Sequence, residues 1–218
     1  MKISVAIDGP AGAGKSTIAT LVAKEFNLMY INTGAMYRAV ALKSSEKGLT
    51  PENKEEICNL ISNMEMHFEN DDLILNGENI QSKITMPEIS SIVSAYASIP
   101  EVRKLLVKLQ RDMSNKYNVI MDGRDIGTVV LKDSKFKIFL TATPEERAER
   151  RYTELVNRNI SCSYDEILKD IIRRDHEDST RETDPLRKAS DAVEIDTTGL
   201  NIKEVTNKIN DFIRSKLN

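Results

Sequence analysis

The chain has 218 residues, which is enough for one sizeable α/β domain with an insertion and short for two full domains. Hydrophobic residues make up 40% of the sequence and charged residues 30%, a composition typical of a soluble globular protein. The formal net charge of −3 argues against a nucleic-acid-binding protein, and no apolar run is long enough to span a membrane. We therefore expect neither nucleic acid nor membrane as a partner.

The cysteines and histidines indicate the compartment. Cys58 and Cys162 lie far apart and form no C-x-x-C motif, which predicts reduced thiols. His67 and His176 are isolated, so no structural zinc site is expected. The apolar run near the N-terminus ends at Asp8, too early for the core of a signal peptide. We expect a cytoplasmic protein.

Residues 3–17 carry the clearest pattern of the chain. A short apolar strand leads into a glycine-rich turn that fits the phosphate-loop motif G-x-x-x-x-G-K-[ST], with Gly9, Gly14, Lys15 and Ser16 at its fixed points. Glycines let backbone N–H groups turn inward around an anion, and the following helix directs its positive N-terminus to the same place. Lys15 is expected to reach the β- and γ-phosphates and Ser16 to ligate Mg²⁺. The residues expected to bind ATP are Gly9, Pro10, Ala11, Gly12, Ala13, Gly14, Lys15, Ser16 and Thr17.

The next segment alternates strand and helix patterns before its character changes. A short buried strand is predicted over 28–31, followed by a helix that Thr33-Gly34 opens and that ends at Gly48. Thr50-Pro51 predicts the start of another helix, as a cap residue followed by proline at the first helical position. Apolar residues then alternate with polar ones and turn signals over 65–84, which predicts a small antiparallel β insertion.

Helical periodicity returns at Pro87 and again at Pro100. Thr143 and Glu146 are placed as a capping box at the start of a later helix. An arginine-rich segment and a final helix complete the chain. Further short apolar strands are predicted at residues 118–121, 136–140 and 193–196.

Five short strands that alternate with helices predict an α/β fold with a five-stranded, parallel, doubly wound sheet. Such sheets bind ligands beyond the carboxyl ends of their strands. The phosphate loop, Thr33-Gly34 and the segment Asp122–Asp125 each follow a predicted strand directly. We therefore expect them to meet in one crevice.

A phosphate loop alone fits a kinase, a GTPase or an ATPase motor. The chain has no guanine-reading N-K-x-D motif, and although Asp122 would suit the acid of an ATPase, little chain remains for coupling elements. The many arginines near strand ends instead favour a second anionic substrate, because guanidinium groups bind phosphate bidentately and stay charged. Phosphoryl transfer between two polyanions depends on positioning, charge neutralisation and exclusion of water, for which a mobile arginine-bearing lid is suited.

Four further motifs resemble the bacterial cytidylate kinase family: T-G-A-M-Y-R at 33–38, S-A-Y-A-S-I-P-E-V-R at 94–103, D-G-R-D-I-G-T at 122–128 and R-R-D-H-E-D-S-T-R at 173–181. The similarity covers essentially the whole chain. It implies one P-loop kinase domain over 1–218, with a nucleoside-monophosphate-binding insertion at about 33–100 and a lid at about 147–160. The implied reaction is phosphoryl transfer from Mg²⁺-ATP to CMP or dCMP.

The resemblance also implies residue roles, by matching motif positions. Lys15, Arg38, Arg124 and Arg181 would be catalytic, and the three arginines would hold the acceptor phosphate or the transferring group. The acceptor site would comprise Thr33, Arg38, Ser94, Arg103, Arg124, Asp125, Arg174, Asp178 and Arg181. Within this set Ser94, Arg103 and Asp125 would read the cytosine edge, and Asp178 with Arg174 would address the ribose. On lid closure ATP phosphates would be reached by Arg147, Arg150 or Arg151.

Several alternatives stay open at this point. The arginines of 147–151 lie among glutamates, so surface pairs within one helix would also explain them. Arg124 and Asp125 would also fit a pair that binds only itself in a tight turn. A kinase acting on UMP, AMP or shikimate is the nearest rival, and a non-catalytic nucleotide-binding switch is a rival of another class. Nothing in the sequence requires more than a monomer.

Overall fold

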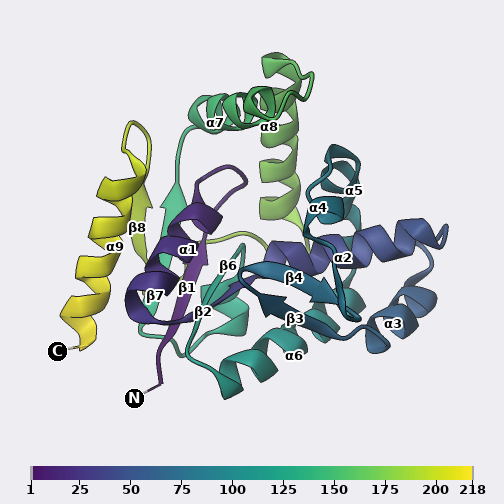
Figure 1. Ribbon diagram of the computed structural model, residues 1–218, viewed down its shortest axis with the longest axis horizontal. Coiled ribbons are helices and arrows are strands. Elements are labelled where there is room, and N and C mark those ends of the chain that lie inside the picture. The colour runs from purple at the N-terminus through teal and green to yellow at the C-terminus, as the bar shows by residue number, and fades with distance from the viewer. Residues whose placement is uncertain (1, 218) are drawn as a thin grey trace.

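The computed structural model describes residues 2–217 and has a five-stranded parallel sheet at its centre (Figure 1). The strand order is β2-β6-β1-β7-β8. The strands span β1 (Ser4–Asp8), β2 (Met29–Asn32), β6 (Val119–Gly123), β7 (Phe136–Thr141) and β8 (Val193–Asp196). All five lie at or within one or two residues of their predicted positions, and the predicted doubly wound α/β fold is confirmed.

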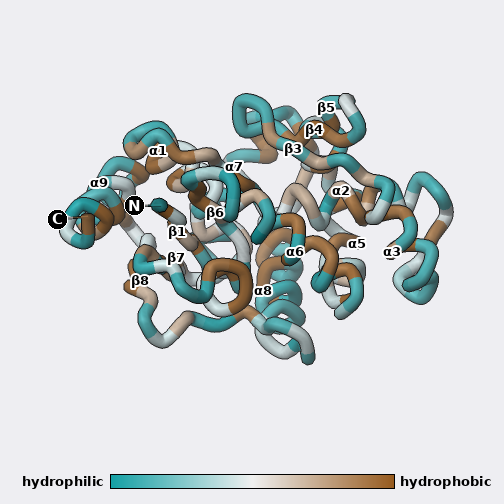
Figure 2. Tube along the Cα trace, turned by 90° about the horizontal axis from the view of Figure 1, so that it is seen from below, coloured by the Kyte–Doolittle hydropathy of each residue, from teal (hydrophilic) through white to brown (hydrophobic). Residues whose placement is uncertain are grey.

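Helices cover both faces of this sheet because side chains alternate along each strand. In β1, Val5 and Ile7 join one hydrophobic cluster, while Ala6 between them joins the other. The first cluster is completed by α1 (Lys15–Phe26) and α9 (Ile202–Leu217). The second is covered by α2 (Thr33–Glu46), α6 (Pro100–Lys116) and the short π-helix η1 (Ile126–Val130). In Figure 2 the brown, hydrophobic stretches run along strands and inner helix faces, and teal stretches mark outer turns.

The insertion has its own small sheet but shares the main core. Its elements are α3 (Lys54–Ser62), β3 (Met66–Glu69), β4 (Asp72–Leu75), β5 (Glu78–Asn79), α4 (Gln81–Ile84) and α5 (Pro87–Ala97). The strands are antiparallel in the order β3-β4-β5, as predicted for 65–84. Buried Ile57, Leu73 and Val93 of the insertion belong to the same cluster as Met121 of the central sheet. The insertion is therefore packed onto the sheet rather than separated from it.

The prediction that Thr50-Pro51 starts a helix is wrong. α3 begins at Lys54, and Asn53 accepts hydrogen bonds from the Thr50 N–H (2.9 Å) and hydroxyl (3.2 Å). Thr50 and Pro51 therefore lie in a turn that precedes the helix. The asparagine side chain closes this turn, and the sequence signal of a cap followed by proline describes the turn equally well.

Two charged helices, α7 (Pro144–Asn157) and α8 (Tyr164–Thr180), pack on one another beyond the carboxyl ends of the strands (Figure 1). Thr143 caps α7 by accepting the Glu146 N–H at 3.3 Å, but the Glu146 carboxylate binds Arg150 (3.0 Å), so only half of the predicted capping box forms. Among the helices of residues 2–217, none combines the length and apolar character that a membrane crossing requires.

Candidate active site

The phosphate loop connects β1 to α1 and depends on glycine for a close approach to β7. A Cβ added to Gly9 would lie 2.0 Å from the carbonyl oxygen of Leu140, and the φ angle of Gly9 is +150°. Gly14, directly before α1, has a left-handed φ of 84°. Only glycine meets both demands without strain, so the loop can wrap tightly at the N-terminus of α1.

Lys15 is buried under this loop and donates from Nζ to the carbonyl oxygen of Pro10 at 2.7 Å. Burial, reinforced by the nearby positive charge of Arg124, lowers the pKa of Lys15 well below its usual value. A polyphosphate in the loop would reverse this effect, because a nearby anion favours the charged ammonium. Asp122, Asp178 and Asp8 oppose the lowering of this pKa but do not outweigh burial and Arg124, so the site favours a further negative charge from a ligand.

Ser16 meets the end of β6 directly. Its hydroxyl donates to Asp122 Oδ2 at 2.8 Å, and the Tyr30 hydroxyl donates to the other carboxylate oxygen at 2.9 Å. The buried Thr33 hydroxyl donates to the Asp122 carbonyl oxygen at 2.7 Å, and its predicted contact with the acceptor stays a prediction. Sequence reasoning considered Asp122 only as the acid of an ATPase, although its place at the end of a buried strand was visible.

Hard oxygen donors at Ser16 and Asp122 fit Mg²⁺. Mg²⁺ is commonly bound through one or two protein oxygens together with substrate phosphates, rather than by a full protein cage. Within residues 2–217 no group of three or more His, Cys, Asp or Glu side chains is placed to hold a metal. The donor set therefore suits an ion that arrives with a nucleotide.

Three arginines from distant parts of the chain form a cationic cluster next to this loop: Arg38 of α2, Arg124 after β6 and Arg174 of α8. The Nε atoms of Arg38 and Arg174 are buried and have no hydrogen-bond partner among the described residues. Burial and the charges of Arg174 and Arg124 lower the pKa of Arg38 to about 10, and burial and Arg124 lower that of Arg174. Buried donors without partners are costly, so the cluster is preorganised for an anion.

Asp178 connects α8 to this cluster. Its Oδ2 accepts from Arg124 Nε at 2.7 Å, and its Oδ1 lies 3.6 Å from a terminal nitrogen of Arg181. Burial disfavours the ionised carboxyl group, but Arg124 and Arg181 outweigh burial and hold the pKa of Asp178 below its usual value. The end of α8 is thereby tied to the end of β6.

A second ionic network surrounds Arg103, which is 1% exposed. Its Nη2 donates to Asp125 Oδ2 at 2.5 Å, its Nε to Asp184 Oδ2 at 3.0 Å and its Nη1 to the Ala97 carbonyl oxygen at 3.1 Å. Arg181 lies 3.4 Å from the other oxygen of Asp125. The alternative in which Arg124 and Asp125 bind only each other is therefore wrong, because each pairs with a different partner.

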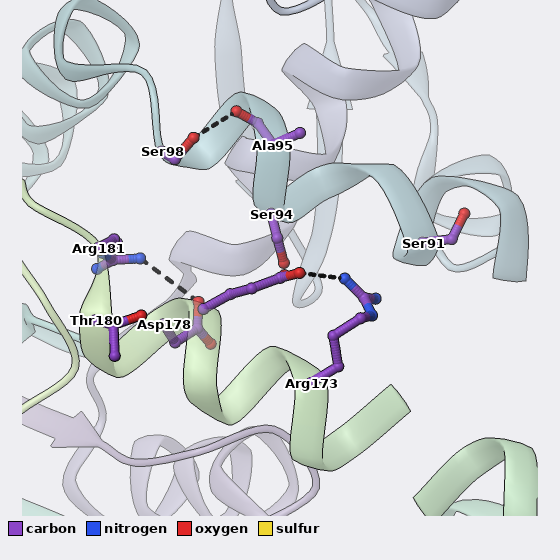
Figure 3. Close-up of a pocket in the computed structure, with 9 residues that line it drawn as sticks. Ser91, Ser94, Ala95, Ser98, Arg173, Asp178, Thr180 and Arg181 are labelled. Carbon is purple, nitrogen blue, oxygen red and sulfur yellow. Dashed lines mark hydrogen bonds and ion pairs between the residues drawn. The ribbon is translucent and has the colours of Figure 1, made fainter. Parts of the chain in front are cut away.

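A cavity of about 290 Å³ opens between α5 and α8. In Figure 3 the Ser94 side chain points from α5 toward α8, on the same side as Asp178, and Arg173 bonds to Glu177 (2.6 Å) beside it. The cavity is lined by Ser91, Ser94, Ala95, Ser98, Arg173, Glu177, Asp178, Thr180 and Arg181. The structure thus brings together three predicted acceptor-site residues, Ser94, Asp178 and Arg181, around one hollow.

The arginines of α7 have different environments. Arg147 is buried and donates to the Ala11 carbonyl oxygen (3.0 Å), to the Ala142 carbonyl oxygen (2.9 Å) and to both carboxylate oxygens of Asp175 (3.0 and 2.6 Å). It therefore supports the phosphate loop from its carbonyl side. Arg150 binds Glu146 and the Thr197 carbonyl and hydroxyl oxygens, and Arg151 binds Glu154 at 2.7 Å. The alternative of pairs within one helix describes Arg151 and only part of the bonding of Arg150, which also reaches Thr197 after β8. The contact of both arginines with ATP stays a prediction.

The profile of the cytidylate kinase family matches residues 5–215. The chain belongs to the cytidylate kinase family. It is 65% identical over 211 residues to a cytidylate kinase of Clostridium perfringens, covering 97% of each chain, and 58% identical over 217 residues to one of Clostridium acetobutylicum, covering 100% of each.

This membership confirms the predicted activity, an ATP-dependent phosphorylation of CMP or dCMP. A solved structure of an uncharacterized protein from Eubacterium ventriosum has a TM-score of 0.54 at 13% identity, covering 99% of each chain, and supports the fold alone. The kinase brings the phosphate loop next to an arginine cluster contributed by α2, α8 and the segment that follows β6. Sequence reasoning missed Asp184, because no pattern near it indicates a contact with Arg103.

Proposed function

We propose that this cytidylate kinase holds the acceptor phosphate in the cluster of Arg38, Arg124 and Arg174, facing the ATP held by the phosphate loop. The unpaired, buried Nε atoms of Arg38 and Arg174 carry this proposal. A bound phosphate would accept from them and offset the repulsion among the three positive charges, whereas water or a neutral ligand would supply no negative charge. Arg174, expected at the ribose, is here assigned to the phosphate, and Arg181, beside Asp125 and Asp178, to the nucleoside end.

Catalysis then needs no general base. The attacking oxygen belongs to a phosphate that is already ionised near neutral pH, since its second pKa is about 6. Lys15 and the arginine cluster neutralise the negative charge of the two phosphate groups and align them for in-line transfer. Mg²⁺, held by Ser16 and Asp122 together with ATP, would add further charge neutralisation at the phosphate oxygens.

The pair Arg103 and Asp125 is proposed to read the base. An ionised carboxylate accepts from the 4-amino group of cytosine, while guanidinium N–H groups donate to its carbonyl oxygen and ring nitrogen. Uracil presents a carbonyl oxygen where cytosine has the amine, so the carboxylate repels it. The Asp178 carboxylate and the Ser94 hydroxyl, which face the cavity between α5 and α8, would position the nucleoside.

The deciding assay measures ADP formation from Mg²⁺-ATP with CMP, dCMP, UMP and AMP offered separately. We expect rapid turnover with CMP and dCMP, little with UMP or AMP, and none with any acceptor for Lys15→Ala. Asp125→Ala is expected to retain phosphoryl transfer while losing much of the preference for CMP over UMP. An Asp125→Ala enzyme as selective as the parent would remove Asp125 from base reading and leave the phosphate site standing.

The remaining proposals concern the state of the enzyme. We propose a monomer in which the insertion binds the nucleoside monophosphate and the α7–α8 region closes over ATP. A cytoplasmic location is supported by Cys58 and Cys162, which are both free thiols. Sedimentation at several concentrations tests the monomer, and a concentration-dependent mass would contradict it.

A further inference from the structure

Asp184 lies in the turn that follows α8, in contact with both ionic networks of the acceptor site. Its carboxylate accepts from Arg103 Nε, and its backbone carbonyl accepts from Arg181 Nε at 2.8 Å. The turn is fixed further by the Leu186 N–H, which donates to the Asp178 carbonyl oxygen at 2.7 Å. The side chain of Asp184 is 28% exposed, while its partner Arg103 is buried. The turn therefore holds this carboxylate against one edge of the arginine.

We propose that Asp184 is a positioning residue: by binding Arg103 Nε, it limits Arg103 to one hydrogen bond with Asp125. The Asp125 carboxylate then remains able to accept a hydrogen bond from the acceptor base. The proposal rests on the role of Arg103 and Asp125 in base reading given above. It assigns to Asp184 a share in the discrimination between cytosine and uracil without direct contact with the nucleotide.

The hydrogen-bond inventory of Arg103 supports this role. A guanidinium has five N–H donors, and Asp184, Asp125 and the Ala97 carbonyl oxygen take one each. Two donors are left for the base. Arg103 meets Asp125 through one nitrogen only, because its Nε edge is committed to Asp184.

Without the Asp184 carboxylate, Arg103 is free to turn its fork toward Asp125. Arginine and carboxylate groups favour such two-bond pairs. A fork would occupy Asp125 Oδ2 and also Oδ1, which Arg181 already approaches at 3.4 Å, and so remove the acceptor for the cytosine amino group. The four charges of the network, Arg103, Arg181, Asp125 and Asp184, also balance to zero, so loss of Asp184 leaves an excess positive charge that strengthens the remaining pairs with Asp125.

The backbone of Asp184 allows a clean test. Its φ angle is +49°, in the left-handed region that glycine, asparagine and aspartate tolerate best. Asp184→Asn and Asp184→Gly both keep this conformation accessible and remove the charge. Asp191→Asn is the matched control, because Asp191 is also a carboxylate paired with a buried cation, Lys137, but lies outside the site.

The experiment measures kcat and KM for CMP and UMP at saturating ATP, KM for ATP, and the thermal midpoint of each variant. For Asp184→Gly we expect kcat/KM for CMP relative to UMP to fall about tenfold, as for a lost hydrogen bond to a charged group, with KM for ATP unchanged. For Asp184→Asn we expect a smaller fall, because the amide oxygen can still accept from Arg103 Nε although the charge is gone. Asp191→Asn is expected to keep the parental ratio. In an Arg103→Lys background, Asp184→Asn should change the ratio no further, because Asp184 acts through Arg103.

Two outcomes would overturn the proposal in distinguishable ways. A lower thermal midpoint with an unchanged CMP-to-UMP ratio would make Asp184 purely structural, while base reading by Arg103 would stand. If Arg103→Lys itself keeps the parental ratio, base reading by Arg103 fails and the role of Asp184 fails with it.

Discussion

At the residue scale, Asp8 links the donor and acceptor halves of the site through two backbone hydrogen bonds. Its carboxylate oxygens accept the N–H groups of Ile126 and Gly127, each at 2.7 Å. These residues open η1 directly after Arg124 and Asp125, so the end of β1 orients the segment that carries both acceptor-site side chains. This arrangement buries Asp8, which is only 3% exposed, and burial disfavours the ionised form of its carboxyl group.

This cost predicts a pH dependence of stability. Burial raises the pKa of Asp8 to about 7, with Asp125 adding to the effect and the two N–H bonds and Lys15 opposing it. Between the unfolded value of about 3.8 and about 7, the native state therefore binds a proton that the unfolded chain releases. The free energy of unfolding should fall as pH rises through this window and level off above it, as far as Asp8 is concerned.

Urea unfolding of the parent and of Asp8→Asn at pH 5, 6, 7 and 8 tests this expectation, because the asparagine side chain has no titratable group. The difference in unfolding free energy between parent and variant should change most steeply below pH 7 and flatten as the pH passes through 7, where native Asp8 loses its proton. Parallel pH profiles for the two proteins would show that Asp8 does not titrate in this range.

At the scale of elements, Arg147 couples the α7–α8 hairpin to the phosphate loop. One side chain binds the Ala11 carbonyl oxygen in the loop and Asp175 on α8, so a displacement of the hairpin pulls directly on the nucleotide-binding backbone. Removing one member of a buried ion pair leaves its partner uncompensated and costs about 3–5 kcal/mol. Because Asp175 is itself partly exposed, the cost here should fall below that range.

We expect Arg147→Met to raise KM for ATP about tenfold or more and to lower the thermal midpoint, with a smaller change in KM for CMP. Arg158→Met, which alters an exposed arginine on the same hairpin 3.6 Å from Glu154, should resemble the parent. Steady-state kinetics and thermal unfolding of the two variants make the comparison. An Arg147→Met enzyme with parental KM for ATP would exclude the coupling.

Elements that depend on local patterns were predictable from the sequence. The phosphate loop needs glycines at fixed spacing, and the five strands are short apolar runs, so both were found near their true bounds. The burial of Arg147 was not predicted, because an arginine among glutamates suggests a surface pair or a phosphate contact; the surface pair is wrong, and the contact with ATP on closure stays a prediction. Its partner Asp175 lies 28 positions away and only the packing of α7 on α8 brings them together.

Asp184 and Thr50 illustrate two further reasons why sequence-based predictions failed: a contact made only by the tertiary fold, and an ambiguous local signal. Asp184 meets Arg103 across 81 positions, and only the tertiary fold creates that contact. At Thr50 the local signal was ambiguous, because a cap residue followed by proline also suits the turn that Asn53 closes. The unpaired Nε atoms of Arg38 and Arg174 were unpredictable for the same reason as the Asp184 contact: their burial depends on the tertiary fold, which a local sequence pattern does not reveal.

At the scale of the whole molecule, one hydrophobic cluster extends from the insertion to the central sheet. Ile57 and Leu73 are 0% exposed and belong to the same cluster as Met121 of β6, which is also fully buried. Neither part can lose this packing without exposing apolar surface of the other. The insertion and the sheet should therefore unfold together.

Calorimetry and circular dichroism should show one transition, with the calorimetric enthalpy equal to the van't Hoff enthalpy. CMP at a hundredfold excess over its dissociation constant should raise the free energy of unfolding by about 2.7 kcal/mol. The thermal midpoint should therefore rise without any splitting of the transition. A separate transition at lower temperature, removed by CMP, would instead identify the insertion as an independent unit.

The strand order also has a consequence for how the protein is made. β1 is the first strand in the chain, yet both of its neighbours, β6 and β7, lie more than a hundred residues later. At ordinary rates of translation, β1 and the phosphate loop wait on the order of ten seconds for those neighbours to emerge from the ribosome. During that time Val5, Ala6 and Ile7 have no sheet to join, so the segment that binds ATP in the finished enzyme is an exposed, aggregation-prone peptide in the nascent one, and a natural client for a chaperone.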